Sequence, residues 1–309
     1  MGKTAFIFSG QGAQYIGMGK ELHDNYSVAR NIFDRANEIL GFDIKNICFN
    51  GPEEDLSDTQ NTQPAILVMS VAVLNVLLKS GFSPDITAGL SLGEYSAMVC
   101  AGIIDFADCL QLVRKRGAFM SEAVPSGVGA MAAIIGLERE IVDSVCEESG
   151  KYGIVHGANY NCPGQIVISG EKKAVEKACE AAREEGASKA VELNVSGPFH
   201  SLLMQDAAKK LAIEVKDIEL NTPKIDFISN VTADYMADLE EIKNNMILQV
   251  MSPVKWEDSI RKMINDGADT FIEVGPGRTL TGFMRKIDRE VNAFNVEDVK
   301  TLEKRLTDK

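Results

Sequence analysis

A serine between two glycines gives the sequence its strongest chemical signal. Residues 89–93 read Gly-Leu-Ser-Leu-Gly, and they follow an apolar run and precede a helical run, Glu94–Cys100. In a nucleophile elbow this GxSxG pattern places the serine on a strained turn between a strand and a helix. The N-terminus of that helix favours developing negative charge. We predict that Ser91 is a nucleophile; a serine in an ordinary strand-to-helix loop is the alternative.

The histidines are the candidate bases, because a serine hydroxyl is a weak nucleophile at neutral pH. His23 lies in a polar, helix-like stretch typical of a surface, and His156 lies in a predicted strand. His200 follows Gly-Pro-Phe in a loop that faces an expected cleft, so we predict that it is the base, with a structural loop histidine as the alternative. No acidic residue stands out as a third member. A carbonyl or amide could orient the imidazole in a Ser–His dyad.

A glycine-rich loop ends the first predicted strand. Residues 9–14 read Ser-Gly-Gln-Gly-Ala-Gln, which is neither a GxGxxG nor a GxxxxGK[ST] phosphate loop. The backbone amides of this loop could complete an oxyanion hole with the amide of Leu92. A plain glycine turn is the alternative interpretation.

Short β-branched runs alternate with amphipathic stretches, which predicts an α/β fold. We expect the main strands at Phe6–Phe8, Ile86–Ala88, Asp226–Ser229 and Thr270–Val274, and helices that include Pro64–Ser80 and Pro253–Asp266. Together with the elbow, these elements predict a large α/β-hydrolase-like domain with a parallel sheet, formed by residues 1–125 and 196–309.

An inserted segment has its own pattern. We expect strands at Gly129–Ile135, Gly153–Asn159, Gln165–Ser169 and Lys189–Leu193, and helices at Glu138–Ser149 and Lys172–Glu185. The order βαββαβ is that of a ferredoxin-like unit. We predict a small ferredoxin-like domain over residues 126–195, and a ligand cleft between the two domains.

Composition limits the classes of function. The 309 residues include 45 acidic and 32 basic residues, a net charge of −13, which disfavours a nucleic-acid binder. The six cysteines show no CxxC pair or zinc-ligand spacing, and we expect mostly buried, reduced thiols. The longest apolar stretch, Ala65–Leu78, is interrupted and too short to span a bilayer. We therefore predict a cytoplasmic protein with no membrane association.

Several segments jointly resemble one family. They are Phe8–Gly12, Gly89–Tyr95, Arg116-Gly117, Gly197–Ser201 and Glu273–Gly277. In this order and spacing they are similar to the malonyl-CoA:acyl carrier protein transacylases of fatty acid synthesis and the acyltransferase domains of polyketide synthases. The resemblance runs from the first strand to at least Phe283, which is nearly the whole chain.

The resemblance implies a role for each matching residue. Ser91 would carry the malonyl group as an ester, His200 would activate it, and the amides of Gln11 and Leu92 would hold the oxyanion. Arg116 would bind the free carboxylate of the malonyl group, since a planar guanidinium meets a carboxylate through two parallel hydrogen bonds. Read alone, Arg116 within Arg114-Lys115-Arg116 would be a surface charge.

Other matches are less direct. Gln249 resembles a family glutamine whose carbonyl orients the histidine, Asn159 and Asn161 resemble polar residues at the cleft rim, and Phe199 resembles the bulky ring that selects malonyl over methylmalonyl. The resemblance implies no metal and no bound cofactor, malonyl-CoA as the substrate, and acyl carrier protein and coenzyme A as partners.

Two positions depart from the family, and three other functions stay open. Leu90 stands where the family usually has histidine, which affects the polarity beside the acyl carboxylate, and Ser9 replaces a common proline. A trans-acting polyketide synthase acyltransferase uses the same motifs. A serine thioesterase or other hydrolase shares the elbow, and a non-catalytic scaffold for the carrier protein would leave Ser91 unlabelled.

Overall fold

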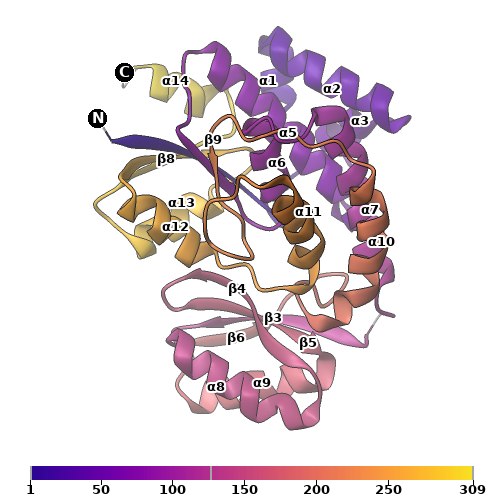
Figure 1. The fold of residues 1–309 in the computed structure, drawn as a ribbon, viewed down its shortest axis with the longest axis vertical. Helices are drawn as coiled ribbons and strands as arrows, with labels where there is room; N and C mark the ends of the chain where they lie inside the picture. Colours follow the sequence, from indigo (N-terminus) through magenta and orange to yellow (C-terminus); the bar gives the residue numbers. More distant parts are fainter. Residues whose placement is uncertain (1, 126, 308–309) are drawn as a thin grey trace.

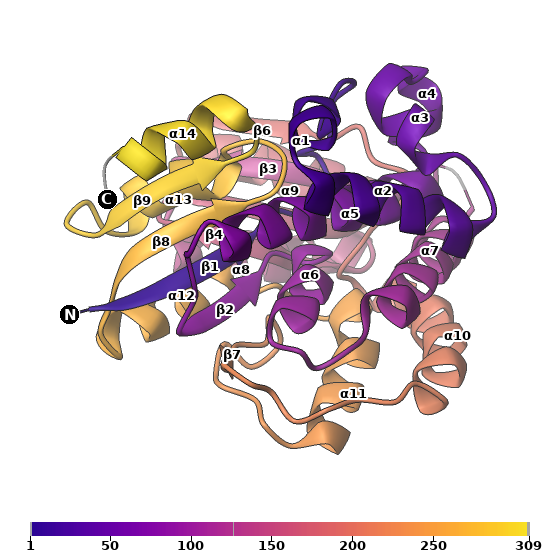
Figure 2. The same cartoon turned by 90° about the horizontal axis from the view of Figure 1, so that it is seen from above.

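The structure is a computed structural model, which describes residues 2–125 and 127–307. Its larger sheet has five parallel strands in the order β7-β2-β1-β8-β9, which Figure 2 shows from above. These strands are β1 (Lys3–Phe8), β2 (Ile86–Gly89), β7 (Asp226–Phe227), β8 (Ala268–Val274) and β9 (Asn292–Val296). Parallel strands place their carboxyl ends along one edge of the sheet, so the segments that follow β1 and β2 lie side by side.

The helices outside the inserted segment pack around this sheet. They are α1 (Lys20–Asn25), α2 (Ser27–Leu40), α3 (Ile44–Asn50), α4 (Glu53–Ser57), α5 (Thr59–Lys79), α6 (Gly93–Cys100), α7 (Phe106–Glu122), α10 (Gln205–Lys216), α11 (Leu239–Leu248), α12 (Trp256–Asn265), α13 (Thr279–Ile287) and α14 (Val299–Thr307). Short 3₁₀ turns, η2 (Leu202–Met204) and η3 (Gln249–Met251), precede α10 and follow α11.

Alternation along β1 builds a core on each face of the larger sheet. Phe6 and Phe8 are buried in a cluster with the apolar residues of α5, whereas Ala5 and Ile7 are buried with Trp256 of α12 on the other face. Successive side chains of a strand point to opposite faces, so both faces of a parallel sheet must be covered.

The long helix α5 corrects one expectation from the sequence. It begins after Asp58, whose side chain caps it by accepting from the Gln60 amide, and it continues through Pro64. By length and composition alone this 21-residue helix could therefore cross a membrane, although the apolar run Ala65–Leu78 was expected to be too short. In the fold, 83% of its apolar window is buried, as in the core helix of a globular domain.

The second sheet has four antiparallel strands in the order β4-β5-β3-β6. The elements are β3 (Gly129–Ile135), α8 (Arg139–Ser149), η1 (Gly150–Tyr152), β4 (Val155–Cys162), β5 (Gln165–Glu171), α9 (Lys172–Glu184) and β6 (Lys189–Glu192). This chain order is the predicted βαββαβ pattern. The predicted first residue of the small domain, Ser126, lies outside the described residues, so the domain limits stay a prediction.

The small sheet covers the larger domain with one face only. Helices α8 and α9 pack on its outer face and lie farthest from the larger sheet in Figure 1. The edge strand β4 is joined to the larger domain by backbone hydrogen bonds, from Val254 N to Ala158 O at 2.8 Å and from Tyr160 N to Val254 O at 3.0 Å. Strand β4 also lines one cavity with the segments that follow β1 and β2, so it lies near the carboxyl edge of the larger sheet.

Candidate active site

The turn between β2 and α6 holds Ser91 in a left-handed backbone conformation, with φ of 52°. Glycines make this turn possible, because a Cβ on Gly89 would lie 2.0 Å from the backbone of Gly93. A Cβ on Gly93 would likewise lie 2.1 Å from the carbonyl oxygen of Phe8. Strand, turn and helix pack at backbone contact, as the elbow interpretation of the sequence requires.

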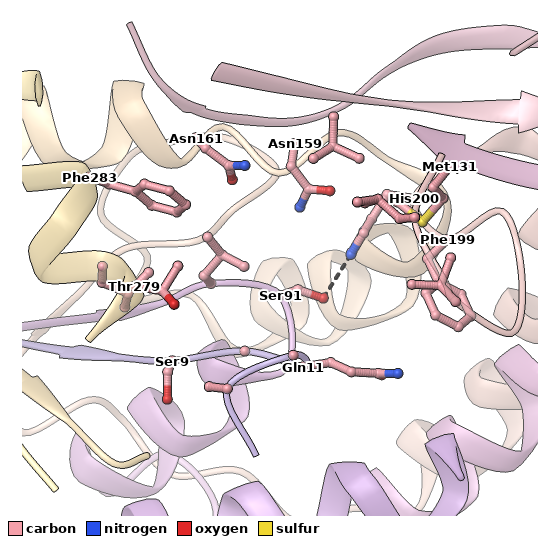
Figure 3. Close-up of a pocket in the computed structure, with 18 of the residues that line it drawn as sticks. Ser9, Gln11, Ser91, Met131, Asn159, Asn161, Phe199, His200, Thr279 and Phe283 are labelled. Atoms are coloured by element: carbon pink, nitrogen blue, oxygen red, sulfur yellow. Dashed lines mark hydrogen bonds between the residues drawn. The ribbon is translucent and has the colours of Figure 1, made fainter. Parts of the chain in front are cut away.

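The imidazole of His200 meets the hydroxyl of Ser91. The Oγ–Nε2 distance is 2.7 Å, the bond drawn in Figure 3. On the other side of the ring, Nδ1 lies 2.8 Å from the carbonyl oxygen of Gln249. A carbonyl can only accept, so Nδ1 carries a proton and, in the neutral ring, Nε2 offers a lone pair to the serine hydroxyl. The pair has the geometry of a nucleophile and its base.

Burial keeps the imidazole neutral. His200 is 3% exposed, and its environment lowers its pKa from 6.5 to about 4. The main cause is removal of the charged form from water, and the second is the positive charge of Arg116. At neutral pH the ring is therefore free to accept a proton.

A cavity of about 300 Å³ lies over this pair, between the two sheets. The larger domain contributes the glycine-rich loop after β1, the nucleophile turn and the start of α13, and the small sheet contributes residues of β3, β4 and β5. In Figure 3 the amides of Asn159 and Asn161 point from above towards the space beside Ser91, with Phe283 at one end and Phe199 at the other. This is the cleft predicted between the domains.

Arg116 brings a buried positive charge to the cavity. It comes from α7, is 1% exposed, and lines the cavity, so the surface interpretation of the Arg-Lys-Arg run does not apply to it. Its guanidinium donates to Gln63 Oε1 at 2.8 Å and to Gln249 Oε1 at 2.9 Å, and lies 3.4 Å from Ser91 Oγ. In the described part of the chain its hydrogen bonds go to neutral acceptors and it forms no salt bridge. Burial lowers its pKa.

Two backbone amides near the nucleophile have no acceptor. Within the described residues, the N–H groups of Gln11 and Leu92 donate no hydrogen bond to the protein. Gln11 lies in the loop after β1 and its side chain donates to Thr59 Oγ1 at 3.1 Å, which fixes the loop beside the cavity. Leu92 is the residue before α6. Unused amides at this position can bind developing negative charge.

The structure places the other predicted residues in two groups. Asn159, Asn161 and Phe199 line the cavity together with Leu90. Gln249, expected among the substrate-binding residues, lies behind the cavity wall, where its carbonyl orients His200 and its amide holds neighbouring groups.

The two remaining histidines lie away from the nucleophile. His156 lines a separate depression beside α8. His23 was expected on the surface, but its side chain is only 16% exposed and packs edge-on against Phe33 and Phe49. The apolar side chains that α2 and α3 send towards it explain this difference.

Three buried polar residues beside the site were missed by sequence reasoning. Gln63 holds the guanidinium of Arg116, and Asn230 accepts from the Ser91 amide at 2.7 Å. Glu94 accepts from the Asn230 amide at 2.6 Å. The one signal in the sequence was the position of Asn230 directly after a predicted strand, where ligand-binding residues of parallel sheets gather.

No group of three or more histidine, cysteine, aspartate or glutamate side chains is placed to hold a metal ion within residues 2–125 and 127–307. The described groups that line the site are three hydroxyls, of Ser9, Ser91 and Thr279, together with an imidazole, a guanidinium, amides and apolar side chains. This set is suited to acyl transfer through a serine ester on a substrate that carries a negative charge.

Known proteins share both this sequence and this fold. The family model for the acyl transferase domain matches residues 5–307. A malonyl CoA-acyl carrier protein transacylase from Bacillus subtilis (strain 168) is 49% identical over 304 residues, which is 98% of this chain and 96% of that protein. The crystal structure of a malonyl CoA-acyl carrier protein transacylase from Clostridium perfringens superimposes with a TM-score of 0.96 at 48% identity, over 99% of this chain and 96% of that one. A malonyl-transacylase solved in complex with a type II PKS acyl-carrier protein gives a TM-score of 0.97 at 41% identity, over 99% of this chain and 100% of that one.

Proposed function

Because this chain belongs to the acyl transferase family, we propose that it transfers a malonyl group from malonyl-CoA to acyl carrier protein in fatty acid biosynthesis. The group would pass through a malonyl ester on Ser91 to the phosphopantetheine thiol of the carrier. The observation that carries this proposal is the 2.7 Å contact between Ser91 Oγ and the neutral imidazole of His200, beside a buried guanidinium without a carboxylate partner.

In the first half-reaction His200 Nε2 takes the proton of the Ser91 hydroxyl as Oγ attacks the thioester carbonyl of malonyl-CoA. The tetrahedral intermediate carries its negative charge on the former carbonyl oxygen, and the free amides of Gln11 and Leu92 supply two donors for it. When the C–S bond breaks, the imidazolium returns the proton to the coenzyme A thiolate. The malonyl group is then an ester of Ser91.

The second half-reaction runs through the same groups in reverse. His200 takes the proton of the carrier thiol, the sulfur attacks the serine ester, and the ester C–O bond breaks as the proton returns to Ser91 Oγ. The carbonyl of Gln249 holds the ring in one tautomer during both halves. Malonyl-CoA enters as a substrate, and the chain's own groups perform each proposed step.

In the proposed function, Arg116 makes the enzyme prefer malonyl over acetyl groups. A buried guanidinium has lost its hydration, and neutral amide oxygens repay this loss only in part. The free carboxylate of a malonyl group would complete its coordination by charge-assisted hydrogen bonds. An acetyl group has no such carboxylate.

A basic surface beside the cavity suits an acidic carrier protein. Helix α13 lines the cavity at its first residue, Thr279, and at Phe283, and its far end is followed by exposed Arg289. Arg285 and Lys286 are also exposed there, and none of these three cations forms a salt bridge within the described chain. Since the chain has a net charge of −13, this local patch is a favourable approach for a negative partner.

We also place the protein in the cytoplasm, as the sequence predicts. The burial of α5 supports a position outside the membrane, because the helix that could by composition cross a membrane belongs to the core.

A donor panel read by intact protein mass tests the proposal. The protein is incubated with malonyl-CoA, methylmalonyl-CoA or acetyl-CoA, and then with acyl carrier protein bearing phosphopantetheine. We expect a malonyl adduct on the wild-type protein, its absence from Ser91→Ala, and its transfer to the carrier. Release of free malonate without transfer would identify a hydrolase instead, and no adduct on the wild type would exclude a serine ester.

A further inference from the structure

Asn230 bridges the two sides of the nucleophile turn. It lies in the loop after β7 and is completely buried. Its Oδ1 accepts a hydrogen bond from the Ser91 amide at 2.7 Å, and its Nδ2 donates to the carbonyl oxygen of Gly89 at 2.7 Å. One amide side chain therefore binds the backbone on both sides of Leu90.

We propose that Asn230, held in place by Glu94, is a positioning residue that fixes the nucleophile turn and thereby the approach of Ser91 to His200. This inference rests on the proposed function, since it concerns the rate at which Ser91 is acylated. Asn230 does not line the cavity and acts through the turn rather than on the substrate.

The strain of the turn explains why such a clamp is needed. A serine at φ of 52° is in a region that residues other than glycine rarely adopt, and it persists only when its surroundings hold it there. The two hydrogen bonds of Asn230 hold the turn at Gly89 and at Ser91, and they give the Ser91 amide an acceptor. Without them the turn can relax, and the hydroxyl leaves its 2.7 Å contact with Nε2.

The same bond determines which amides are left to bind an oxyanion. Because Asn230 occupies the N–H of Ser91, that amide is not available to substrate. The amides of Leu92 and Gln11 are without acceptors in the described chain. The Ser91 amide is therefore used to hold the turn, whereas the adjacent amide of Leu92 stays available to bind the oxyanion in the proposed mechanism.

Glu94 fixes Asn230 from behind. It stands in the first turn of α6 and is 1% exposed, and its Oε2 accepts from the Asn230 backbone amide at 2.6 Å. Burial raises its pKa to about 7, against the opposing effect of this hydrogen bond. A carboxyl group is costly to bury, so its position here indicates that the bond to the loop is important for the fold of the site.

Gln249 joins this clamp to the base. Its Nε2 donates to the Ser91 carbonyl oxygen at 3.0 Å and lies 3.5 Å from Asn230 Oδ1, while its own carbonyl orients His200. The nucleophile and the base are thus held by two residues that contact each other. A displacement of Asn230 should disturb the distance between the reacting groups more than the binding of malonyl-CoA.

The test measures the rate of malonyl-enzyme formation by rapid mixing and intact mass, over a range of malonyl-CoA concentrations. We expect Asn230→Ala to lower the maximal acylation rate about 100-fold, since a misplacement of about 1 Å has this effect on positioned groups. The half-saturating concentration of malonyl-CoA should change less than about threefold, because ground-state binding is not altered. Asn245→Ala is the matched control, another buried asparagine of the larger domain whose amide contacts Met236 instead of the turn.

Glu94 supplies a second pair of variants. Glu94→Gln keeps an oxygen acceptor for the Asn230 amide and should retain the wild-type rate, whereas Glu94→Ala leaves that amide unpaired and should slow acylation. If Asn230→Ala does not fold, as judged by circular dichroism and thermal melting, this pair of variants tests the positioning role of Asn230 instead.

Acylation at the wild-type rate by folded Asn230→Ala would overturn the inference, and so would equal rates for Glu94→Gln and Glu94→Ala. Loss of malonyl-CoA binding in parallel with rate would also contradict a positioning role. Failure of the proposed function is a separate result, because the wild-type protein itself would then form no adduct.

Discussion

Replacement of Arg116 by alanine should remove the preference for malonyl groups. In the proposed complex the malonyl carboxylate meets a guanidinium that is 1% exposed and that donates, within the described chain, to the neutral amides of Gln63 and Gln249 and to the Ser91 hydroxyl. Truncating one member of a buried, hydrogen-bonded charge pair costs about 2–5 kcal/mol. At about 1.4 kcal/mol for each factor of ten, a central value near 3.5 kcal/mol corresponds to a loss of roughly 300-fold in kcat/KM for malonyl-CoA.

Acetyl-CoA isolates the indirect part of this effect. Arg116→Ala also leaves Gln63 and Gln249 without their charged partner, which affects every donor. The loss of these hydrogen bonds between neutral amides and Arg116 should cost about 1 kcal/mol, so acetyl transfer should fall about fivefold. The ratio of malonyl to acetyl transfer should thus fall by nearly two orders of magnitude.

The assay compares kcat/KM for the two donors with one carrier protein. Arg114→Ala is the control on the same helix, because its guanidinium donates to the Leu40 carbonyl oxygen at 3.3 Å and lies outside the cavity. It should leave both donors unchanged. Equal losses for malonyl-CoA and acetyl-CoA in Arg116→Ala would refute the carboxylate role and leave Arg116 as a structural cation.

Three further outcomes are expected. Because burial and Arg116 lower the pKa of His200 to about 4, acylation should be lost only as pH falls through about that value, when Nε2 becomes protonated; a pH profile of the single-turnover rate with a midpoint near the ordinary 6.5 would contradict this. Phe199→Ala enlarges the cavity, so the ratio of methylmalonyl to malonyl labelling should rise about tenfold, and an unchanged ratio would show that the ring does not select the acyl group. Lys286→Glu should raise KM for the carrier protein about tenfold at low salt without changing acylation. Lys300→Glu, the same charge change at an exposed position of α14, should not raise it, and equal effects of the two would disprove docking beside α13.

Much of the fold could be predicted because its signals are local. The elbow, the parallel strands at both ends of the chain and the βαββαβ segment each follow from apolar periodicity and turn residues, and β3 begins and ends at the predicted residues. The edge strands of the larger sheet were harder to predict from the sequence. Strand β9, of sequence Asn-Ala-Phe-Asn-Val, was missed, since its side chains are mostly half-buried and its pattern is weakly apolar. Strand β7 has two residues rather than the predicted four, because the chain turns away towards Asn230.

The extent of β4 shows how a small error in a boundary affects the site. The strand was predicted to end at Asn159, but it continues to Cys162. Asn159 and Asn161 are therefore two residues apart within a strand, where side chains share a face, and both line the cavity rather than a loop at its rim. Periodicity did not reveal this extension because Pro163 and Gly164 follow directly, and polar residues beside them are typical of a turn.

The candidate site was accessible to sequence reasoning only where a residue type is scarce or a motif is local. Ser91 stands in a glycine motif, and His200 is one of three histidines, so elimination could find it. Glutamine and asparagine have no such mark. Gln63 lies in α5 and Asn230 in a distant loop, and only the packing of these elements around the cavity brings their amides to Arg116 and to the nucleophile turn.

The reacting pair is also where the backbone departs most from ordinary rules. Among the non-glycine residues described, only Ser91, His200 and Ala233 have positive φ, and two of these three share the 2.7 Å hydrogen bond. Each left-handed residue costs about 1–2 kcal/mol, so local propensity opposes the arrangement that the proposed chemistry requires. The stabilisation that offsets this backbone strain must come from buried hydrogen bonds that form only in the complete fold. Examples are the bonds of Asn230 to the turn and the bond from the His200 amide to the Val250 carbonyl oxygen at 3.0 Å. The strained backbone at Ser91 and His200 therefore depends on these buried hydrogen bonds. A variant that loses the bonds should lose the alignment of Ser91 with His200 before it loses the fold.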